Sequence, residues 1–70
     1  MNNSIAIVDD DKEIAHIESL TLQKEGYRTT VYPDGASFLA SLKSGKPDLI
    51  ILDLMLPDID GLSLLKKVRE

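Results

Sequence analysis

The chain has 70 residues, of which 43% are hydrophobic, and a net charge of −4. This length allows at most one domain, and the hydrophobic fraction is too high for an intrinsically disordered chain. A domain of this size buries only ~60% of the surface that its unfolded chain exposes, so we expect a thin core. The sequence has no cysteine, which excludes a disulfide or a thiolate-bound metal as a brace.

Charge and apolar run length exclude two kinds of partner. The first residues, MNNSIAIVDDD, lack the basic region and apolar length of a signal peptide. No stretch approaches the ~20 apolar residues that span a bilayer, so we expect a cytoplasmic chain without a membrane contact. Basic residues gather only in LLKKVRE at the end of the sequence. Phosphate neutralisation needs a concentrated basic face, so we expect no direct nucleic-acid contact by this segment.

A change in hydrophobic period marks the first two elements. The apolar run SIAIV, at positions 4–8, predicts a buried strand. After an acidic triplet, apolar side chains recur at three- and four-residue spacing, which predicts one face of a helix. That face consists of Ile14, Ile17, Leu20 and Thr21. Asp10 or Asp11 can cap the start of this helix, and Gly26 can end it.

The middle of the chain predicts a polar strand and a short helix. The segment YRTTVY, at positions 27–32, places Tyr27, Thr29 and Val31 on one face of a strand and Arg28 and Thr30 on the other. The tripeptide PDG, at positions 33–35, predicts a turn. A short amphipathic helix then starts at Ala36, and SGKP ends it. Its apolar positions are Phe38, Leu39 and Leu42.

The last third of the sequence predicts a strand, an acidic loop and a helix. DLIIL, at positions 48–52, is continuously apolar, so we expect a strand covered on both faces. After PDIDG, a third helix is predicted, with apolar positions Leu62, Leu64, Leu65 and Val68. Its late cations suit the negative end of the helix dipole. They are Lys66, Lys67 and Arg69.

The alternation of strands and helices predicts a parallel α/β sheet. The second strand is the most polar and is therefore expected at the edge. The first and third strands then lie side by side, which gives the order 2-1-3 of a flavodoxin-like, doubly wound fold.

Carboxylates follow the two strands that are expected to be neighbours. Asp9 and Asp10 follow the first strand, and Asp53 ends the third. The carboxyl ends of parallel strands lie at one edge of the sheet, where open α/β folds bind ligands. Two unit charges ~4 Å apart repel by about 4 kcal/mol at an effective dielectric constant near 20. Such a cluster favours a bound proton or a cation, and oxygen ligands of this kind suit Mg²⁺ or Mn²⁺.

Other polar residues have simpler interpretations. Four aspartates are expected to cap helices or shape turns: Asp11, Asp34, Asp58 and Asp60. His16 lies off the apolar face of its helix and is expected in solvent. The side chain of Met55 is expected to serve in packing.

At these residues the sequence resembles a known family. IAIVDDD, GYRTTVYPDG and PDLIILDLMLPDIDGLSLLKKVR together resemble the receiver domain of bacterial two-component response regulators. The resemblance covers residues 4–70, so the chain is expected to form the N-terminal portion of such a domain, residues 1–70, truncated in the third helix. LDLMLPDIDG is most similar to the subfamily with a winged-helix DNA-binding output domain.

The resemblance implies specific roles. Asp53 would accept a phosphoryl group from a sensor histidine kinase, and Asp10 would bind Mg²⁺ directly. Asp9 would hold the ion through water, and the backbone carbonyl of Met55 would be a further ligand. The remaining implied site residues, Pro57 and Gly61, would shape the pocket loop. The chain would not be an enzyme in the ordinary sense, but would promote its own phosphorylation and dephosphorylation.

Two alternatives stay open. A phosphohydrolase of the aspartate-nucleophile class would want a second acid where Met55 stands, and a dinucleotide-binding half-fold would want glycines where the sequence has DDDKE. The family's fourth and fifth strands, with a hydroxyl residue and a lysine of the phosphorylation site, do not occur in the sequence. The chain is therefore expected to label slowly by itself, or to act as a phosphorylation-incompetent interaction module. It is also expected to self-associate through the third-strand edge or a helix face.

Overall fold

The computed structural model describes residues 3–53 and 56–69. The elements follow one another as β1 (Ser4–Val8), α1 (Lys12–Lys24), β2 (Arg28–Tyr32), α2 (Gly35–Ser41), a 3₁₀ turn η1 (Leu42–Ser44), β3 (Leu49–Leu52) and α3 (Gly61–Arg69). The predicted first strand is confirmed with the same bounds, whereas β2 and β3 each begin one residue later than predicted. No helix in the described ranges is long and apolar enough to cross a membrane.

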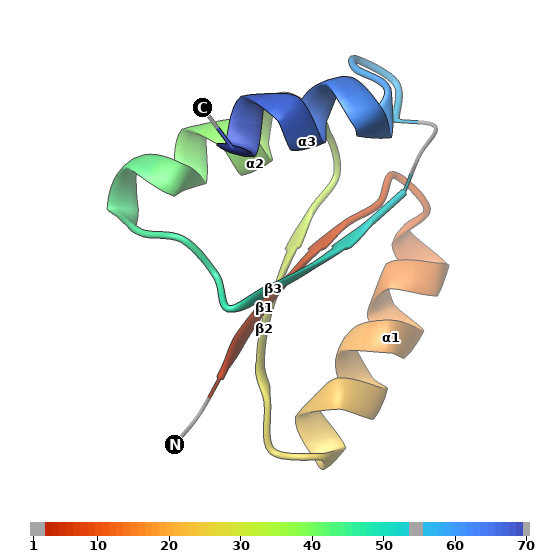
Figure 1. The fold of residues 1–70 in the computed structure, drawn as a ribbon. Coiled ribbons are helices and arrows are strands. Elements are labelled where there is room, and N and C mark those ends of the chain that lie inside the picture. The colour runs from red at the N-terminus through yellow and green to blue at the C-terminus, as the bar shows by residue number, and fades with distance from the viewer. Residues whose placement is uncertain (1–2, 54–55, 70) are drawn as a thin grey trace.

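The three strands form one parallel sheet in the order β2-β1-β3, as predicted. The register sets Ser4 of β1 opposite Arg28 of β2, and Val8 of β1 opposite Leu52 of β3. Figure 1 shows α1 on one side of the sheet and α2 with α3 on the other. This is the fold expected for a doubly wound sheet, with its strand ends gathered at one edge.

Two apolar clusters hold the layers together. On the side of α2 and α3, the buried residues are Ala6, Val8, Phe38, Leu56 and Leu64. On the side of α1, the buried residues in the described ranges are Ile5, Ile7 and Ala15. Because side chains alternate along β1, this strand contributes buried residues to both faces of the sheet.

The predicted buried face of α1 is wrong. Ile14, Ile17 and Leu20 are 50%, 63% and 45% exposed, and the helix turns Ala15 and Leu22 to the sheet instead. The small side chain of Ala15, fully buried, allows the helix to approach the sheet closely. Ile14, Ile17 and Leu20 lie on other sides of the helix and point outward.

The prediction that β3 is covered on both faces is also wrong. Leu49 is 55% exposed, and the other residues of β3 are half-buried. Ile50 and Leu52 pack against the cluster under α2 and α3, while Ile51 packs against the cluster under α1. Helices thus contact both faces of β3 but do not close over them.

Candidate metal and phosphoryl site

The strand ends bring the three predicted carboxylates together. The amide of Asp53 donates to the carbonyl of Val8 at 2.9 Å, and the amide of Asp9 donates to the carbonyl of Tyr32 at 3.0 Å. These bonds continue the pairing of β3 with β1 and of β1 with β2 by one residue. Asp9 and Asp53 are therefore fixed side by side by the backbone at the carboxyl edge of the sheet.

The side chains of Asp9, Asp10 and Asp53 converge. Each offers a carboxylate oxygen that lies within 4.8 Å of those offered by the other two. Asp9 and Asp53 are half-buried and Asp10 is exposed, so the cluster opens to solvent on one side. Asp9 is also oriented locally, because its Oδ1 accepts a hydrogen bond from the amide of Asp11 at 2.9 Å.

The donor set fits a small hard cation. Oxygen ligands at about 2.1 Å from one Mg²⁺ lie roughly 3–4 Å apart, so separations within 4.8 Å need only small side-chain adjustments. Mg²⁺ keeps several waters and takes one or two carboxylates, which suits a cluster with an open side. Met55, whose carbonyl was implied as a further ligand, lies outside the described residues.

The remaining aspartates act as caps, as predicted, but one of them caps a distant helix. Asp11 accepts from the amides of Glu13 and Ile14 at 3.1 Å each, and Asp34 accepts from the amide of Ser37 at 2.8 Å. Asp60 accepts from the amide and hydroxyl of Ser63. These five hydrogen bonds are local, and the sequence pattern predicts the three caps.

Asp58 connects the loop after the acidic cluster to α2. Its two carboxylate oxygens accept from the amides of Gly35 at 2.9 Å and Ala36 at 2.8 Å. The hydrogen bond from Gly35, and then that from Ala36, hold the pKa of Asp58 below its ordinary value. The sequence does not predict this contact, because a turn aspartate gives no sign of a partner 22 or 23 residues away.

Gly35 permits this contact. A Cβ at Gly35 would collide with Cγ2 of Ile59, so only a glycine lets the loop approach the start of α2 so closely. Of the two implied loop residues, Gly61 is buried at the start of α3, whereas Pro57 is exposed. The loop is therefore anchored between α2 and α3.

Other predicted surface residues lie away from the cluster. His16 is exposed on α1, as predicted. Lys66, Lys67 and Arg69 lie in the last turns of α3. Within the described ranges, no histidine or cysteine joins the acidic cluster.

Comparison with known proteins gives one consistent result. Residues 5–70 match the family model described as the response regulator receiver domain. The chain is 44% identical over 70 residues to the regulatory protein VanRc of Enterococcus gallinarum and 39% identical to the transcriptional regulatory protein PhoP of Bacillus subtilis. These alignments cover 100% of the chain, but only 30% and 29% of the relatives.

Solved structures agree with this result. The chain is similar to the response regulator TrrA of Thermotoga maritima in complex with Mg²⁺ and BeF, with a TM-score of 0.89 and 36% identity. That alignment covers 99% of this chain and 59% of the other. A putative response regulator from Chloroflexus aurantiacus gives a TM-score of 0.94 at 36% identity, covering 100% of this chain and 57% of that one.

Proposed function

Because the chain belongs to the response regulator receiver domain family, we propose that it carries the phospho-accepting site of a two-component signalling protein. Asp53 is the acceptor, and Asp10 binds a divalent cation beside it. Asp9 orients the water around that cation. The observation that supports this most is the meeting of three carboxylates, with oxygens within 4.8 Å of one another, at the ends of two adjacent strands.

Asp53 acts as a nucleophile in this proposal. One carboxylate oxygen forms a bond to phosphorus while the bond from phosphorus to the donor breaks. The product is an acyl phosphate on Asp53, and the dephosphorylated donor departs with the electron pair of the broken bond. When bound, Mg²⁺ neutralises the negative charge of the phosphoryl oxygens. Asp53 is half-buried and its carboxylate lies beside those of Asp9 and Asp10, so the nucleophile and the proposed cation would be held close together.

The donor in the cell would be a phosphohistidine of a sensor kinase. Modification adds about −1.5 to −2 units of charge next to the loop that Asp58 anchors. Relatives named as transcriptional regulators support a transcriptional output in the full-length parent. The chain spans about 30% of the curated relatives that it matches, so we propose the output for the parent protein and not for the residues described.

Metal binding tests the site directly. We expect weak, saturable binding of Mg²⁺ or Mn²⁺. Amide chemical shifts or calorimetry measure this binding. Asp53→Asn and Asp10→Asn should each weaken it by about tenfold or more, because each removes one of few charged ligands. Glu25→Gln is the matched control, since it removes one negative charge at the other end of α1. Equal affinity in Asp53→Asn would remove Asp53 from the site.

Phosphorylation tests the acceptor. A small acyl phosphate with Mg²⁺ should add one phosphoryl group to the full-length parent, measured by intact mass and removed at alkaline pH. Asp53→Asn should abolish the adduct, and Glu25→Gln should retain it. We expect slow labelling of the 70-residue chain. Labelling of Asp53→Asn at the normal rate would contradict the proposal.

A further inference from the structure

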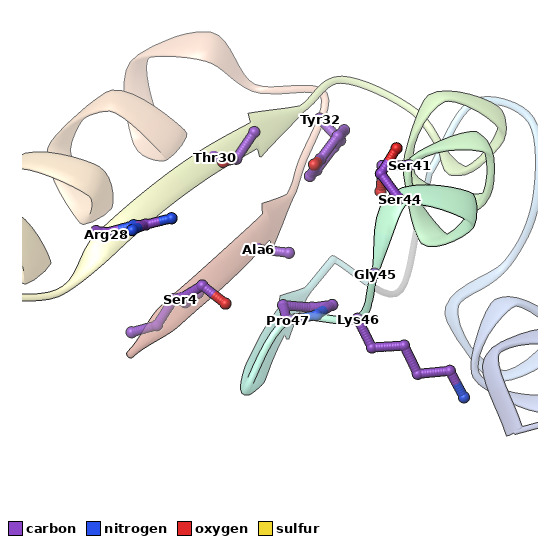
Figure 2. A pocket seen from close by; sticks show the side chains of 11 residues that line it. Ser4, Ala6, Arg28, Thr30, Tyr32, Ser41, Ser44, Gly45, Lys46 and Pro47 are labelled. Carbon is purple, nitrogen blue, oxygen red and sulfur yellow. The ribbon is translucent and has the colours of Figure 1, made fainter. Parts of the chain in front are cut away.

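A second hollow lies at the opposite end of the sheet from the acidic cluster. Its volume is about 510 Å³, within the range of roughly 300–1,000 Å³ typical of small-molecule sites. Figure 2 shows the side chains of β1 and β2 on one wall and the segment after α2 on the other. Apart from Tyr32, whose carbonyl accepts from the amide of Asp9, the hollow is built by residues that the metal and phosphoryl site does not use.

Small residues and a short helix create this space. Helix α2 ends at Ser41, and the side chains of Arg28 and Thr30 on β2 stay exposed. The floor is Ala6, whose side chain is a single methyl group, and the far wall includes Gly45, which has no side chain. Neither residue fills the gap that the end of α2 leaves.

Four polar side chains that line the hollow have no hydrogen-bond partner among the described residues. Arg28 and Thr30 project from β2 on one face with Tyr32, and Ser44 lies across from them (Figure 2). Within the described part of the chain, the guanidinium of Arg28 and the hydroxyls of Thr30, Tyr32 and Ser44 have no hydrogen-bond or ion-pair partner. A guanidinium only donates hydrogen bonds, and each hydroxyl can donate one, so these groups favour a ligand that brings acceptors.

Charge around the hollow favours an anion. None of the described residues that line it is acidic, although the chain as a whole carries a net charge of −4. The nearby carboxylate of Asp48 is engaged by the amide of Ser4 at 2.8 Å. Lys46 also lines the hollow, but its ammonium extends away and donates to the carbonyl of Val68 at 3.4 Å. Among the described residues that line the hollow, Arg28 is thus the cation available to a ligand.

We propose that this hollow binds a small organic anion through a carboxylate or phosphate group. The planar guanidinium of Arg28 donates two parallel hydrogen bonds to the oxyanion, a geometry that lysine does not provide. The hydroxyls of Thr30, Tyr32 and Ser44 orient the remaining oxygens. Ala6 and the ring of Tyr32 contact the carbon part of the ligand.

Titration with inorganic phosphate and with succinate, at constant ionic strength and without a divalent cation, tests this site. We expect saturable shifts of amides near Ala6, Thr30 and Gly45. Tighter binding of one probe identifies the group that the hollow prefers. Absence of saturable binding by both probes would overturn the proposal.

Variants separate this site from general charge attraction. Arg28→Gln should weaken binding at least tenfold, and Arg28→Lys should weaken it several-fold, because the charge stays and the two-pronged geometry is lost. Lys43→Gln removes a cation of η1 that does not line the hollow, and it should leave the affinity unchanged. Arg28→Lys also controls for folding of the edge strand. Equal weakening by Arg28→Gln and Lys43→Gln would show charge attraction only and would refute the site.

Discussion

The two faces of the sheet differ in how completely helices cover them. The face under α2 and α3 buries Phe38, Leu64 and Val8 completely. The face under α1 buries two isoleucines of β1 and Ala15, while Ile14 and Ile17 of α1 stay half or more exposed. Figure 1 shows α1 on that side of the sheet and α2 with α3 on the other. The stability of the described fold therefore depends mainly on the α2 and α3 face, since buried apolar area is its main source.

Polar contacts also leave the α1 face less completely closed than the face under α2 and α3. On the α1 face, Ser19 and Thr29 share a hydrogen bond of 2.6 Å, and Gln23 donates to Thr29 at 2.9 Å. Between α1 and β3, however, a groove of about 250 Å³ stays open, and Oε1 of Glu18 is buried there without a partner in the described residues. On the other face, Asp58 ties the loop to α2 with both of its oxygens. The loop that follows Asp53 is thus anchored on the better packed side.

The largest expected effect comes from removing the centre of the packed face. Phe38→Ala should lower the free energy of unfolding by about 3–5 kcal/mol, because it leaves a cavity at a fully buried site. Ile17→Ala should change it by less than about 0.5 kcal/mol, because Ile17 is 63% exposed. Urea unfolding measures both values.

A milder variant guards this comparison against simple loss of folding. Phe38→Leu keeps most of the apolar volume and should cost about 1 kcal/mol. If Ile17→Ala proved as costly as Phe38→Ala, the α1 face would be covered in solution, and the contrast between the faces would fail.

The next largest effect is expected at Gly35, where the loop that contains Asp58 and Ile59 lies close to α2. Gly35→Ala should cost about 1–3 kcal/mol, because the new methyl group meets Ile59 and the loop has to move. Ala36→Ser, next to it and exposed, should stay within about 0.5 kcal/mol. Urea unfolding again gives the values. An unchanged stability in Gly35→Ala would show that the loop is not held against α2.

Sequence predicts the elements of this fold well because their signals are local. The strand SIAIV, the cap Asp11 and the order β2-β1-β3 follow from short patterns and from the polarity of one strand. The meeting of Asp9, Asp10 and Asp53 follows from that order. The helix face of α1 was mispredicted because periodicity finds where large apolar residues lie. It does not find that a small residue, Ala15, sets the contact.

Long-range contacts escape such reasoning. The bond from Asp58 to α2 depends on a loop path and on the absence of a side chain at Gly35. The hollow near Arg28 depends on where α2 ends and on two missing side-chain volumes. Neither gives a periodic signal in the sequence.

The thinly covered face is expected to promote self-association. Ile14, Ile17 and Leu20 are exposed on α1, and β3 pairs only with β1 in the described residues, so its other edge is open. We expect concentration-dependent association at micromolar concentration, measured by sedimentation velocity. Ile17→Asp should raise the dissociation constant at least tenfold, since burial of one isoleucine contributes roughly 1.5–3 kcal/mol.

Leu62→Asp is the matched control for this effect. Leu62 is 69% exposed but belongs to α3, on the other side of the sheet, so its substitution should leave the association unchanged. A chain that stays monomeric at every concentration would contradict the expectation that the α1 face or the β3 edge needs a partner.

The smallest expected effect is on the pH dependence of stability. It distinguishes Asp58, which contacts a distant helix, from Asp60, which makes a local cap. Hydrogen bonds from Gly35 and Ala36 lower the pKa of Asp58, and those from the amide and hydroxyl of Ser63 lower the pKa of Asp60. Because the pKa of each carboxyl is lowered in the folded state, each carboxylate stabilises the fold at pH values above the ordinary pKa of 3.8. This contribution is lost as the pH falls through the lower pKa of the folded state. Asp58→Asn should therefore reduce stability at neutral pH, and the difference in stability between this variant and the wild type should shrink below pH 3.8.

Amide exchange separates the long-range contact of Asp58 from the local cap of Asp60. Asp58→Asn should increase exchange at the amides of Gly35 and Ala36, which are distant in sequence. Asp60→Asn should increase exchange only at the amide of Ser63. Unchanged exchange at Gly35 in Asp58→Asn would mean that Asp58 does not hold its loop against α2. Apolar packing alone would then stabilise the face under α2 and α3.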